Sequence, residues 1–338
     1  MHSRLYILSV LVFAMLLACS SHDSSKLLWK FRREYPTVSA PVVSNDNLYV
    51  GGDKLYCLNK KTGKPVWQFA TFGPVSFSPV VAHDCVFFIC GGLYCLDAAS
   101  GKVRWEFWKG HWAERAPVVA DLFVYTAINS TVYCLDARQG NIAWKKKLDK
   151  DVSLSPIKVA GGFVYIQSEG EFYCLKSGDG TLVWRKSIAP NWCFYAIANN
   201  KLYVVGFADN VYCVDGQNGT TIWHQTIAYS GLTRIAIEDN DLYIRADKLY
   251  CLNVLTGVLA WESDIGHLVI GPPVISGTWV MAAISGNQIL CLDRRTGAKL
   301  WTIEAPPGNF VFADKCLYIS SLDYNVYCIS IPAASHSG

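Results

Sequence analysis

Hydrophobic and polar residues alternate over short runs along most of the chain, which is the pattern of half-buried β-strands. One such run, KLYCL at 54–58, is followed by the polar segment NKKTG and by a second alternating run, KPVWQF. A glycine that ends such a segment adopts the positive φ angle that closes a tight turn. Each pair of runs therefore predicts a β-hairpin, and the chain is expected to be all-β.

The hairpin pattern recurs as an ungapped twelve-residue unit in which Cys is second, Gly is eighth and Trp is twelfth. Periods between copies are 37 to 40 residues, and the copies begin at Tyr56, Tyr94, Tyr133, Tyr173, Tyr212, Tyr250 and Leu290. An eighth copy starts at Tyr327 and stops before its Gly and Trp, whereas Trp29 lacks the preceding half. Repeats of this length with strand-like content predict a propeller or a solenoid.

Each repeat has room for four strands. Pro followed by Val or Ile marks a further run twelve residues after several Trp, at Pro41, Pro79, Pro117, Pro156 and Pro273, and a fourth run such as 47–52 follows. This predicts an eight-bladed β-propeller of four-stranded blades. A solenoid would need a cap at each end, whereas here the two chain ends complement each other. We expect the strand that contains Trp29 to pair into the last blade, which closes the ring and removes both free edges.

The repeated tryptophans are predicted to be structural residues that lie between neighbouring blades. Burial of about 200 Å² of each indole would contribute at most about 5 kcal/mol. The set consists of Trp29, Trp67, Trp105, Trp144, Trp184, Trp223, Trp261 and Trp301.

The overall composition excludes some classes of partner. The net charge is only +3 among 338 residues, and Lys145–Lys147 is the one basic block that stands out. Binding of nucleic acid needs a basic face that neutralises phosphates, so none is expected. Aromatic residues make up 13% of the chain, with 12 Trp and only 3 Met, which is typical of β-rich proteins.

The N-terminus has the features of an export signal. A positive charge in 1–4 precedes an apolar run at 5–18, which is short for a membrane-spanning helix but typical of a signal peptide. The run ends LLACS, which resembles a bacterial lipobox, so Cys19 is predicted to be lipidated; the alternative is an ordinary signal peptide with an incidental Cys. The predicted divisions are a lipoprotein signal peptide at 1–18, a flexible tether at 19–26, the propeller at 27–332 and a tail at 333–338. Ser20 in place of Asp favours an outer-membrane anchor facing the periplasm.

The remaining cysteines are not expected to form disulfides or a metal site. There are 13 Cys and no Cys-x-x-Cys motif. Those of the repeat are predicted to be small buried hydrophobes, because equivalent positions in adjacent blades should be too far apart to bridge. Cys85 and Cys90 are expected on one strand, where they cannot bridge each other.

Candidate binding residues gather in the segments that follow each Trp and cross between blades on one face. The sequence has no His-Glu-x-x-His, Gly-x-Ser-x-Gly or phosphate-loop motif. Arg, Trp and Tyr are enriched at the centres of protein interfaces. We therefore predict a protein- or ligand-binding face, the alternative being an undistinguished polar rim; the candidates are His111, Trp112, Glu114, Arg115, Trp192, Tyr229, Arg234, Arg245 and His267.

The repeat, as in YCLDAASGKVRW at 94–105, resembles the PQQ-like (quinoprotein alcohol dehydrogenase-like) β-propeller repeat over roughly 27–332. The resemblance implies an eight-bladed ring. The family includes quinoprotein dehydrogenases and also non-catalytic scaffolds, among them the outer-membrane lipoprotein of the β-barrel assembly machinery. The inserted loops, adjacent-Cys disulfide and calcium site of the dehydrogenases are missing from this sequence, which predicts a non-enzyme without cofactor or metal.

These observations lead to one functional hypothesis and two alternatives. We hypothesise a monomeric, lipid-anchored, periplasm-facing scaffold that binds protein partners, with a role in outer-membrane protein assembly. The alternatives are a small PQQ-dependent periplasmic oxidoreductase and a ligand-sensing propeller. A bound quinone would distinguish the enzyme from the other two.

Overall fold

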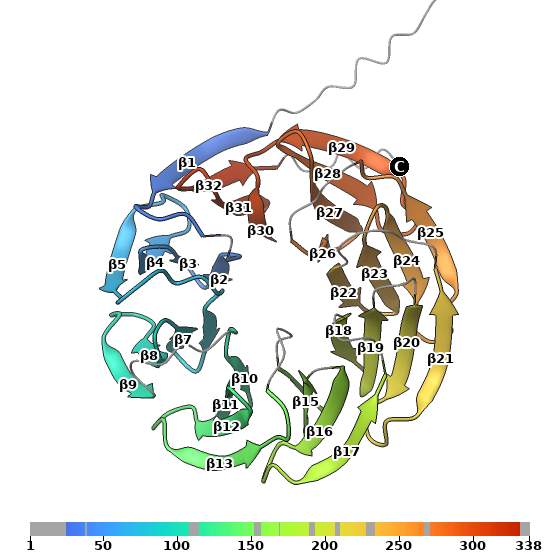
Figure 1. Ribbon diagram of the computed structural model, residues 1–338. Helices are drawn as coiled ribbons and strands as arrows, with labels where there is room; N and C mark the ends of the chain where they lie inside the picture. Colours follow the sequence, from blue (N-terminus) through green and yellow to red (C-terminus); the bar gives the residue numbers. More distant parts are fainter. Residues whose placement is uncertain are drawn as a thin grey trace, which may run out of the picture.

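The computed structural model describes residues 25–37, 39–107, 115–151, 157–168, 170–188, 193–206, 210–227, 234–266 and 271–331. Every regular element in these ranges is a β-strand, and the strands form eight four-stranded antiparallel sheets arranged as a ring (Figure 1). The predicted all-β, eight-bladed propeller is thus confirmed. Within the same ranges, no helix has the length and apolar character needed to span a bilayer.

The strands of each blade follow one another from the ring axis outward (Figure 1). Blades 1 to 4 are β2 (Val42–Ser44), β3 (Asn47–Gly51), β4 (Lys54–Asn59) and β5 (Pro65–Ala70); β6 (Val80–Ala82), β7 (Cys85–Ile89), β8 (Leu93–Asp97) and β9 (Val103–Phe107); β10 (Val118–Ala120), β11 (Phe123–Ile128), β12 (Thr131–Asp136) and β13 (Ile142–Lys147); β14 (Lys158–Ala160), β15 (Phe163–Ser168), β16 (Glu171–Lys176) and β17 (Leu182–Ser187). Blades 5 to 7 are β18 (Cys193–Ala198), β19 (Lys201–Gly206), β20 (Asn210–Asp215) and β21 (Thr221–Thr226); β22 (Arg234–Glu238), β23 (Asp241–Arg245), β24 (Leu249–Asn253) and β25 (Leu259–Ser263); β26 (Val274–Ser276), β27 (Trp279–Ile284), β28 (Gln288–Asp293) and β29 (Lys299–Glu304).

The eighth blade joins the two ends of the chain. Its strands are β30 (Gly308–Ala313), β31 (Cys316–Ser321), β32 (Asn325–Ser330) and, outermost, β1 (Lys26–Arg32). Trp29 lies opposite Cys328 in this pairing, as each complete repeat places its own Trp opposite its own Cys. The ring therefore closes as predicted, by the N-terminal strand completing the last blade (Figure 1).

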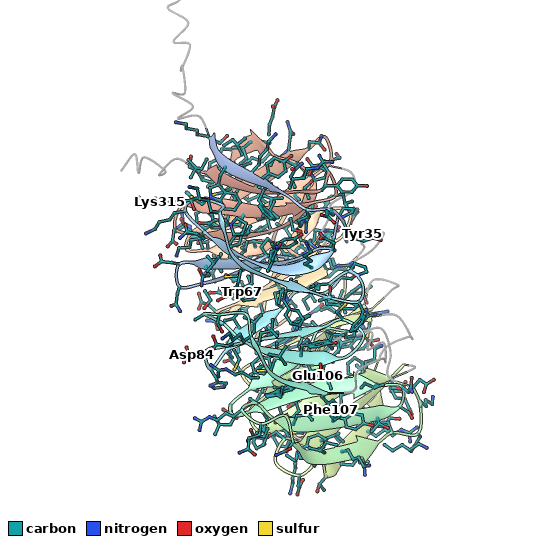
Figure 2. All side chains as sticks on the ribbon, turned by 90° about the vertical axis from the view of Figure 1, so that its left-hand side faces the viewer. Tyr35, Trp67, Asp84, Glu106, Phe107 and Lys315 are labelled. Atoms are coloured by element: carbon teal, nitrogen blue, oxygen red, sulfur yellow. The ribbon has the colours of Figure 1, made fainter. Side chains whose placement is uncertain are left out.

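The ring has two distinct faces. The turn face carries the hairpin turns between the first two strands of each blade, such as those at Asp84 and Lys315, and the turns of the twelve-residue unit. On the crossing face, the chain passes from the outer strand of one blade to the inner strand of the next, as at Tyr35. Figure 2 shows Asp84 and Lys315 on one side of the ring and Tyr35 on the other.

In six of the eight blades, three adjacent strands place a Tyr, the repeat Cys and the repeat Trp side by side; in blades 2 and 7 the Tyr is replaced by Phe87 and Met281. In blade 1, Tyr49 lies opposite Cys57, and Cys57 lies opposite Trp67. The two ring centroids are 5.9 Å apart, with the small thiol between them in the row. The same order recurs as Tyr125–Cys134–Trp144, Tyr165–Cys174–Trp184, Tyr203–Cys213–Trp223 and Tyr243–Cys251–Trp261. A small residue is needed in this row because the flanking strands both carry large rings.

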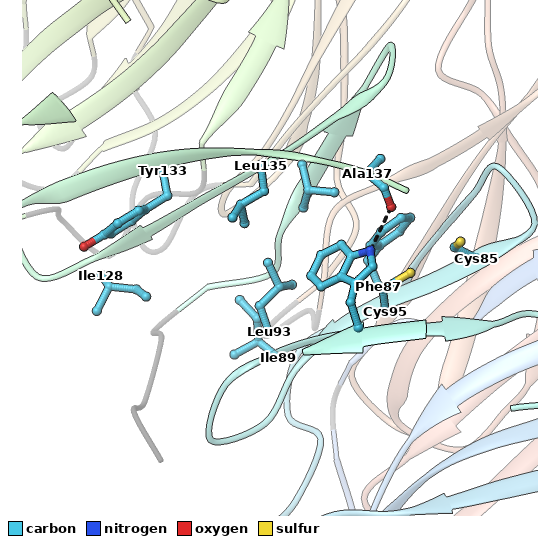
Figure 3. Close-up of a cluster of buried hydrophobic side chains, with 11 residues drawn as sticks. Cys85, Phe87, Ile89, Leu93, Cys95, Ile128, Tyr133, Leu135 and Ala137 are labelled. Carbon is cyan, nitrogen blue, oxygen red and sulfur yellow. Dashed lines mark hydrogen bonds between the residues drawn. The ribbon is translucent and has the colours of Figure 1, made fainter. Parts of the chain in front are cut away.

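Each Trp also connects its blade to the next one. The indole Nε1 of Trp105 donates a hydrogen bond to the carbonyl of Ala137, 3.0 Å away (Figure 3). The indole ring of Trp105 covers Gly140, whose φ angle is +74°. A Cβ added to Gly140 would lie 2.6 Å from the indole. Equivalent contacts pair Trp29 with Gly63, Trp67 with Gly101, Trp144 with Gly180, Trp184 with Gly219, Trp223 with Gly257 and Trp261 with Gly297. The repeat is ungapped because one hairpin must present its Gly to the preceding Trp and its Trp to the following Gly.

An acidic or amide side chain fixes the shape of most of these turns. The Asp97 carboxylate accepts hydrogen bonds from the Ser100 backbone N–H (2.8 Å) and hydroxyl (2.7 Å). It also pairs with the Arg104 guanidinium at 2.6 Å. The bonds from Arg104 and Ser100 hold the pKa of Asp97 well below its usual range. Asn59 and Asn253 make the same turn contacts with an amide oxygen.

Replacing Asp97 by Ala is expected to lower the free energy of unfolding by about 1 to 2 kcal/mol at pH 7, because the turn loses its acceptor. Asp97→Asn should lower the free energy of unfolding by less, because Asn accepts the same turn hydrogen bonds at two equivalent positions, Asn59 and Asn253. The folded-state pKa is depressed, so the ionic contribution is present above pH about 4 and is lost as the pH falls below it. Urea unfolding at pH 7 and pH 3 measures this: the difference between wild type and Asp97→Asn should shrink at pH 3, and an unchanged difference would contradict the account.

The cysteines of the described residues are free, and all except Cys316 are buried. Burial raises the pKa of Cys57 and of Cys174 to about 12, and that of Cys134 to about 11. The repeat thiols are therefore held in their neutral form within the packing between blades, as expected for small hydrophobes.

We predict that iodoacetamide at pH 8 alkylates these repeat thiols at least about 100-fold more slowly in the native protein than in urea, because the thiolate is the reactive species. The half-buried Cys316 serves as the internal control and should react first. Peptide mass mapping after timed labelling measures each site. Rapid native labelling of Cys57 or Cys174 would show that the blades open far more readily than this packing implies.

Candidate functional site

The crossing face carries the predicted binding residues that the structure describes: Arg115, Arg234 and Arg245. The other binding candidates lie outside the described residues; they are His111, Trp112, Glu114, Trp192, Tyr229 and His267. The predicted lipidation site, Cys19, also lies outside them. Arg234 begins the innermost strand of blade 6, and Arg245 ends the neighbouring strand.

Arg234 and Arg245 lie directly opposite each other in the β22–β23 pairing. The Arg234 guanidinium stacks over the ring of Phe194 in blade 5, with its carbon 4.4 Å from the ring centroid. Arg245 is 5% exposed and donates a hydrogen bond through Nη1 to the carbonyl of Gly271, at the start of blade 7. The two cations thus touch three consecutive blades at the inner rim.

Electrostatics at this pair disfavour positive charge. Burial and the neighbouring Arg234 lower the pKa of Arg245 to about 10, and burial also lowers the pKa of Arg234. Like charges directly opposite each other on two strands are destabilising. An anion between the two side chains would offset both effects.

A lysine that the sequence did not single out lies at the inner rim of blade 4. Lys158 starts β14 and pairs with Tyr165, and burial lowers its pKa. The position is apolar in every other blade, where it is occupied by Val42, Val80, Val118, Ala196, Ala236, Val274 and Val311. The inner strands β14, β18 and β22 pack consecutively around the axis, so Lys158 and the arginine pair belong to one arc of the rim.

Arg115 lies just before β10 of blade 3, the blade next to that of Lys158. Its guanidinium carbon lies 5.9 Å from the centroid of the Phe77 ring. The structure therefore brings Arg234 and Arg245 together, whereas Arg115 lies against Phe77, just before β6 of blade 2.

Carboxylates on the crossing face lie further from the axis than these cations. They occupy the turns that precede the third strand of a blade, and each accepts a hydrogen bond from a tyrosine of that strand. The pairs are Tyr56 with Asp53 (2.8 Å), Tyr250 with Asp247 (3.0 Å) and Tyr327 with Asp323. Of these pairs, Tyr250 with Asp247 belongs to blade 6, the blade that carries the arginine pair.

A further buried arginine, Arg33, closes the ring and was also missed in the sequence. It is 1% exposed, and burial lowers its pKa to about 10. Its Nη1 donates to the carbonyl of Gly51 in blade 1 (2.6 Å) and to the hydroxyl of Ser320 in blade 8 (3.0 Å), and its Nη2 donates to the carbonyl of Ser321 (2.8 Å). Arg33 is therefore a structural residue.

Among the described residues, no group of three or more His, Cys, Asp or Glu side chains is placed to hold a metal ion. The described part of the crossing face presents guanidinium and ammonium groups. This arrangement can bind an anion.

The chain matches the family described as outer membrane protein assembly factor BamB over residues 16–92, 90–191 and 207–314. It belongs to this family. No match is found among curated proteins. BamB from Moraxella catarrhalis superposes with a TM-score of 0.72 at 16% identity, covering 91% of this chain and 100% of that protein.

Two further solved structures share the fold. The computationally designed Ika8 protein has a TM-score of 0.79 at 14% identity, with coverage of 90% of this chain and 99% of that chain. The quinohemoprotein alcohol dehydrogenase ADHIIG from Pseudomonas putida HK5 has a TM-score of 0.67 at 12% identity, with coverage of 91% and 78%. Both the BamB-like and the quinoprotein members of the predicted superfamily are thus represented, and at these identities the likeness shows the fold.

Proposed function

We propose that this protein is a non-enzymatic scaffold of outer-membrane protein assembly that binds protein partners through its crossing face. The match to the BamB family along most of the propeller carries this proposal. The likeness to the Moraxella BamB structure, which this chain covers along its whole length, supports it as well. A shared ring does not by itself fix function, so the experiment below tests the proposal directly.

The scaffold acts, in this proposal, as a monomer on a lipid anchor at Cys19. The lipobox-like segment LLACS supports the anchor. Stable membrane attachment needs more than one acyl chain, and a triacylated N-terminal cysteine meets that need. The described part of the chain begins next to β1, at the outer edge of blade 8, and an N-terminal anchor would therefore be connected at the circumference of the ring (Figure 1).

The experiment that tests this proposal is the intact mass and absorbance spectrum of the protein purified from its own membranes without added cofactor. We expect the mass of residues 19–338 plus acyl chains, and no chromophore beyond the aromatic residues. A quinone-like absorption band with the matching extra mass would overturn the scaffold in favour of a small periplasmic oxidoreductase. An unmodified N-terminus would overturn the anchor alone.

A further inference from the structure

The arginine pair of blade 6 has features that ring stability does not require. At the Arg234 position the sequences of the other seven blades have uncharged residues: Ala40, Ser78, Ala116, Pro156, Phe194, Pro272 and Asn309. The repeat thus folds without a cation at this place. Two opposed guanidinium groups at the inner rim raise the free energy of the folded state, because like charges face each other across the strand pair.

The surrounding contacts hold both side chains in place. The Phe194 ring lies under the Arg234 guanidinium, and the Gly271 carbonyl accepts from Nη1 of Arg245. Each guanidinium has five N–H donors in a planar fork, and such a fork matches the two oxygens of a carboxylate. Side chains that are already oriented lose little entropy on binding, which favours recognition.

We propose that Arg234 and Arg245, with Lys158 further along the same arc, form a carboxylate-binding site at the inner rim of the crossing face, and that its ligand is an acidic extended segment of a partner protein. This inference rests on the proposed function, which supplies a protein as the partner. The three cations lie in two different blades, which favours an extended segment with several carboxylates over a single small anion. The inner strands β14, β18 and β22 pack consecutively, and Lys158 lies two register positions further along its strand than Arg234, so the cations are distributed over blades 4 to 6 rather than gathered at one point.

The acidic groups nearer the outside define the direction of approach. Asp247 accepts from Tyr250 in blade 6, and Asp149 and Glu171 pair with Arg185 in blade 4. The Asp247 carboxylate would repel an acidic side chain placed beside it, whereas Arg185 compensates the charges of Asp149 and Glu171. An acidic ligand is therefore directed toward the axis.

Fluorescence polarisation with the full-length protein in detergent tests the site. The probe is a labelled peptide of alternating Asp, Glu and Gly, and its matched counterpart has Asn and Gln in place of the acids. We expect saturable binding of the acidic peptide only. Arg234→Gln and Arg245→Gln should each weaken it at least tenfold, and Lys158→Gln by less, since it lies further from the pair.

Arg185→Gln is the control, because it removes the same charge from the outermost strand of blade 4, away from the inner rim. Equal binding of the two peptides, or an equal loss in Arg185→Gln, would overturn the site. Circular dichroism of each variant establishes that the ring is intact. Pyrroloquinoline quinone, which also carries carboxylates, is tested in parallel to distinguish a small-molecule ligand from a peptide. Tight binding of the quinone with no binding of the peptide would overturn the peptide proposal.

The site and the proposed function can fail separately. If the acidic peptide does not bind but outer-membrane assembly components still co-purify with the protein, only the carboxylate site is wrong. If the peptide binds in an arginine-dependent manner but no assembly component co-purifies, the site stands and the scaffold function is wrong.

Discussion

Replacing Arg33 by Ala is expected to lower the free energy of unfolding by about 3 to 5 kcal/mol, the largest loss from a single substitution in the propeller. Arg33 connects the first and last blades through Gly51 and Ser321, whose carbonyls it satisfies inside the protein. The alanine variant leaves buried acceptors without this donor and opens a cavity at the closure. Urea unfolding measures the loss as a lower midpoint with an unchanged slope.

Arg32→Ala is the matched control for this substitution. Arg32 is adjacent in the chain but exposed, and its guanidinium carbon lies 5.7 Å from the centroid of the Tyr324 ring. We expect it to cost less than about 1 kcal/mol. If the two variants lower the free energy of unfolding equally, the β1–β32 pairing alone closes the propeller, and the hydrogen bonds of Arg33 do not stabilise the closure.

Gly101→Ala is expected to lower the free energy of unfolding by about 3 kcal/mol. The φ angle of Gly101 is +70°, which costs an alanine roughly 1 kcal/mol. The Cβ of the new alanine would also lie 2.6 Å from the Trp67 indole, so the indole would have to move. That movement would strain the hydrogen bond from Trp67 to the Ala98 carbonyl, now 3.0 Å long.

Gly277→Ala separates the two contributions to this loss. Gly277 has a φ of +57°, and an added Cβ meets nothing within 4 Å. Only the backbone cost of roughly 1 kcal/mol should appear there. Urea unfolding of the two variants gives the comparison, and equal losses would mean that contact between Trp and Gly does not hold neighbouring blades together.

The repeat made the architecture predictable. Seven complete copies of the Cys–Gly–Trp unit set the blade number, and the offset between Trp29 and Cys328 set the closure, because every blade must have the same outer hairpin. The physical role of the unit needed the structure, since the contact between Trp67 and Gly101 joins different copies of the repeat.

The residues at the closure and at the inner rim were harder to predict. Arg33 stands four residues after its Trp, where the later repeats have Leu148, Ile188, Ile227, Ile265 and Ala305. The first two copies have Thr71 and Lys109 there, so an alignment of the copies would not have singled out Arg33, whereas it would have revealed Lys158 among valines and alanines. The opposition of Arg234 and Arg245 depends on the register of two strands, and composition alone does not give register.

The remaining candidates depend on the crossing segments. These segments differ in sequence from blade to blade, so the repeat does not determine their conformation. The positions His111, Trp112, Glu114, Trp192, Tyr229 and His267 remain predictions. If substitution of Trp112 or Trp192 weakens partner binding, the interface extends beyond the arginine pair.

The most direct test of the scaffold is affinity purification of the protein from its own membranes after brief crosslinking, followed by identification of the captured proteins. We predict that components of the outer-membrane protein assembly machinery are enriched over a control lipoprotein, and that Arg234→Gln/Arg245→Gln reduces their recovery while Arg185→Gln does not. Capture of no assembly component by the intact protein, under conditions in which the assembly machinery itself is recovered, would contradict the account.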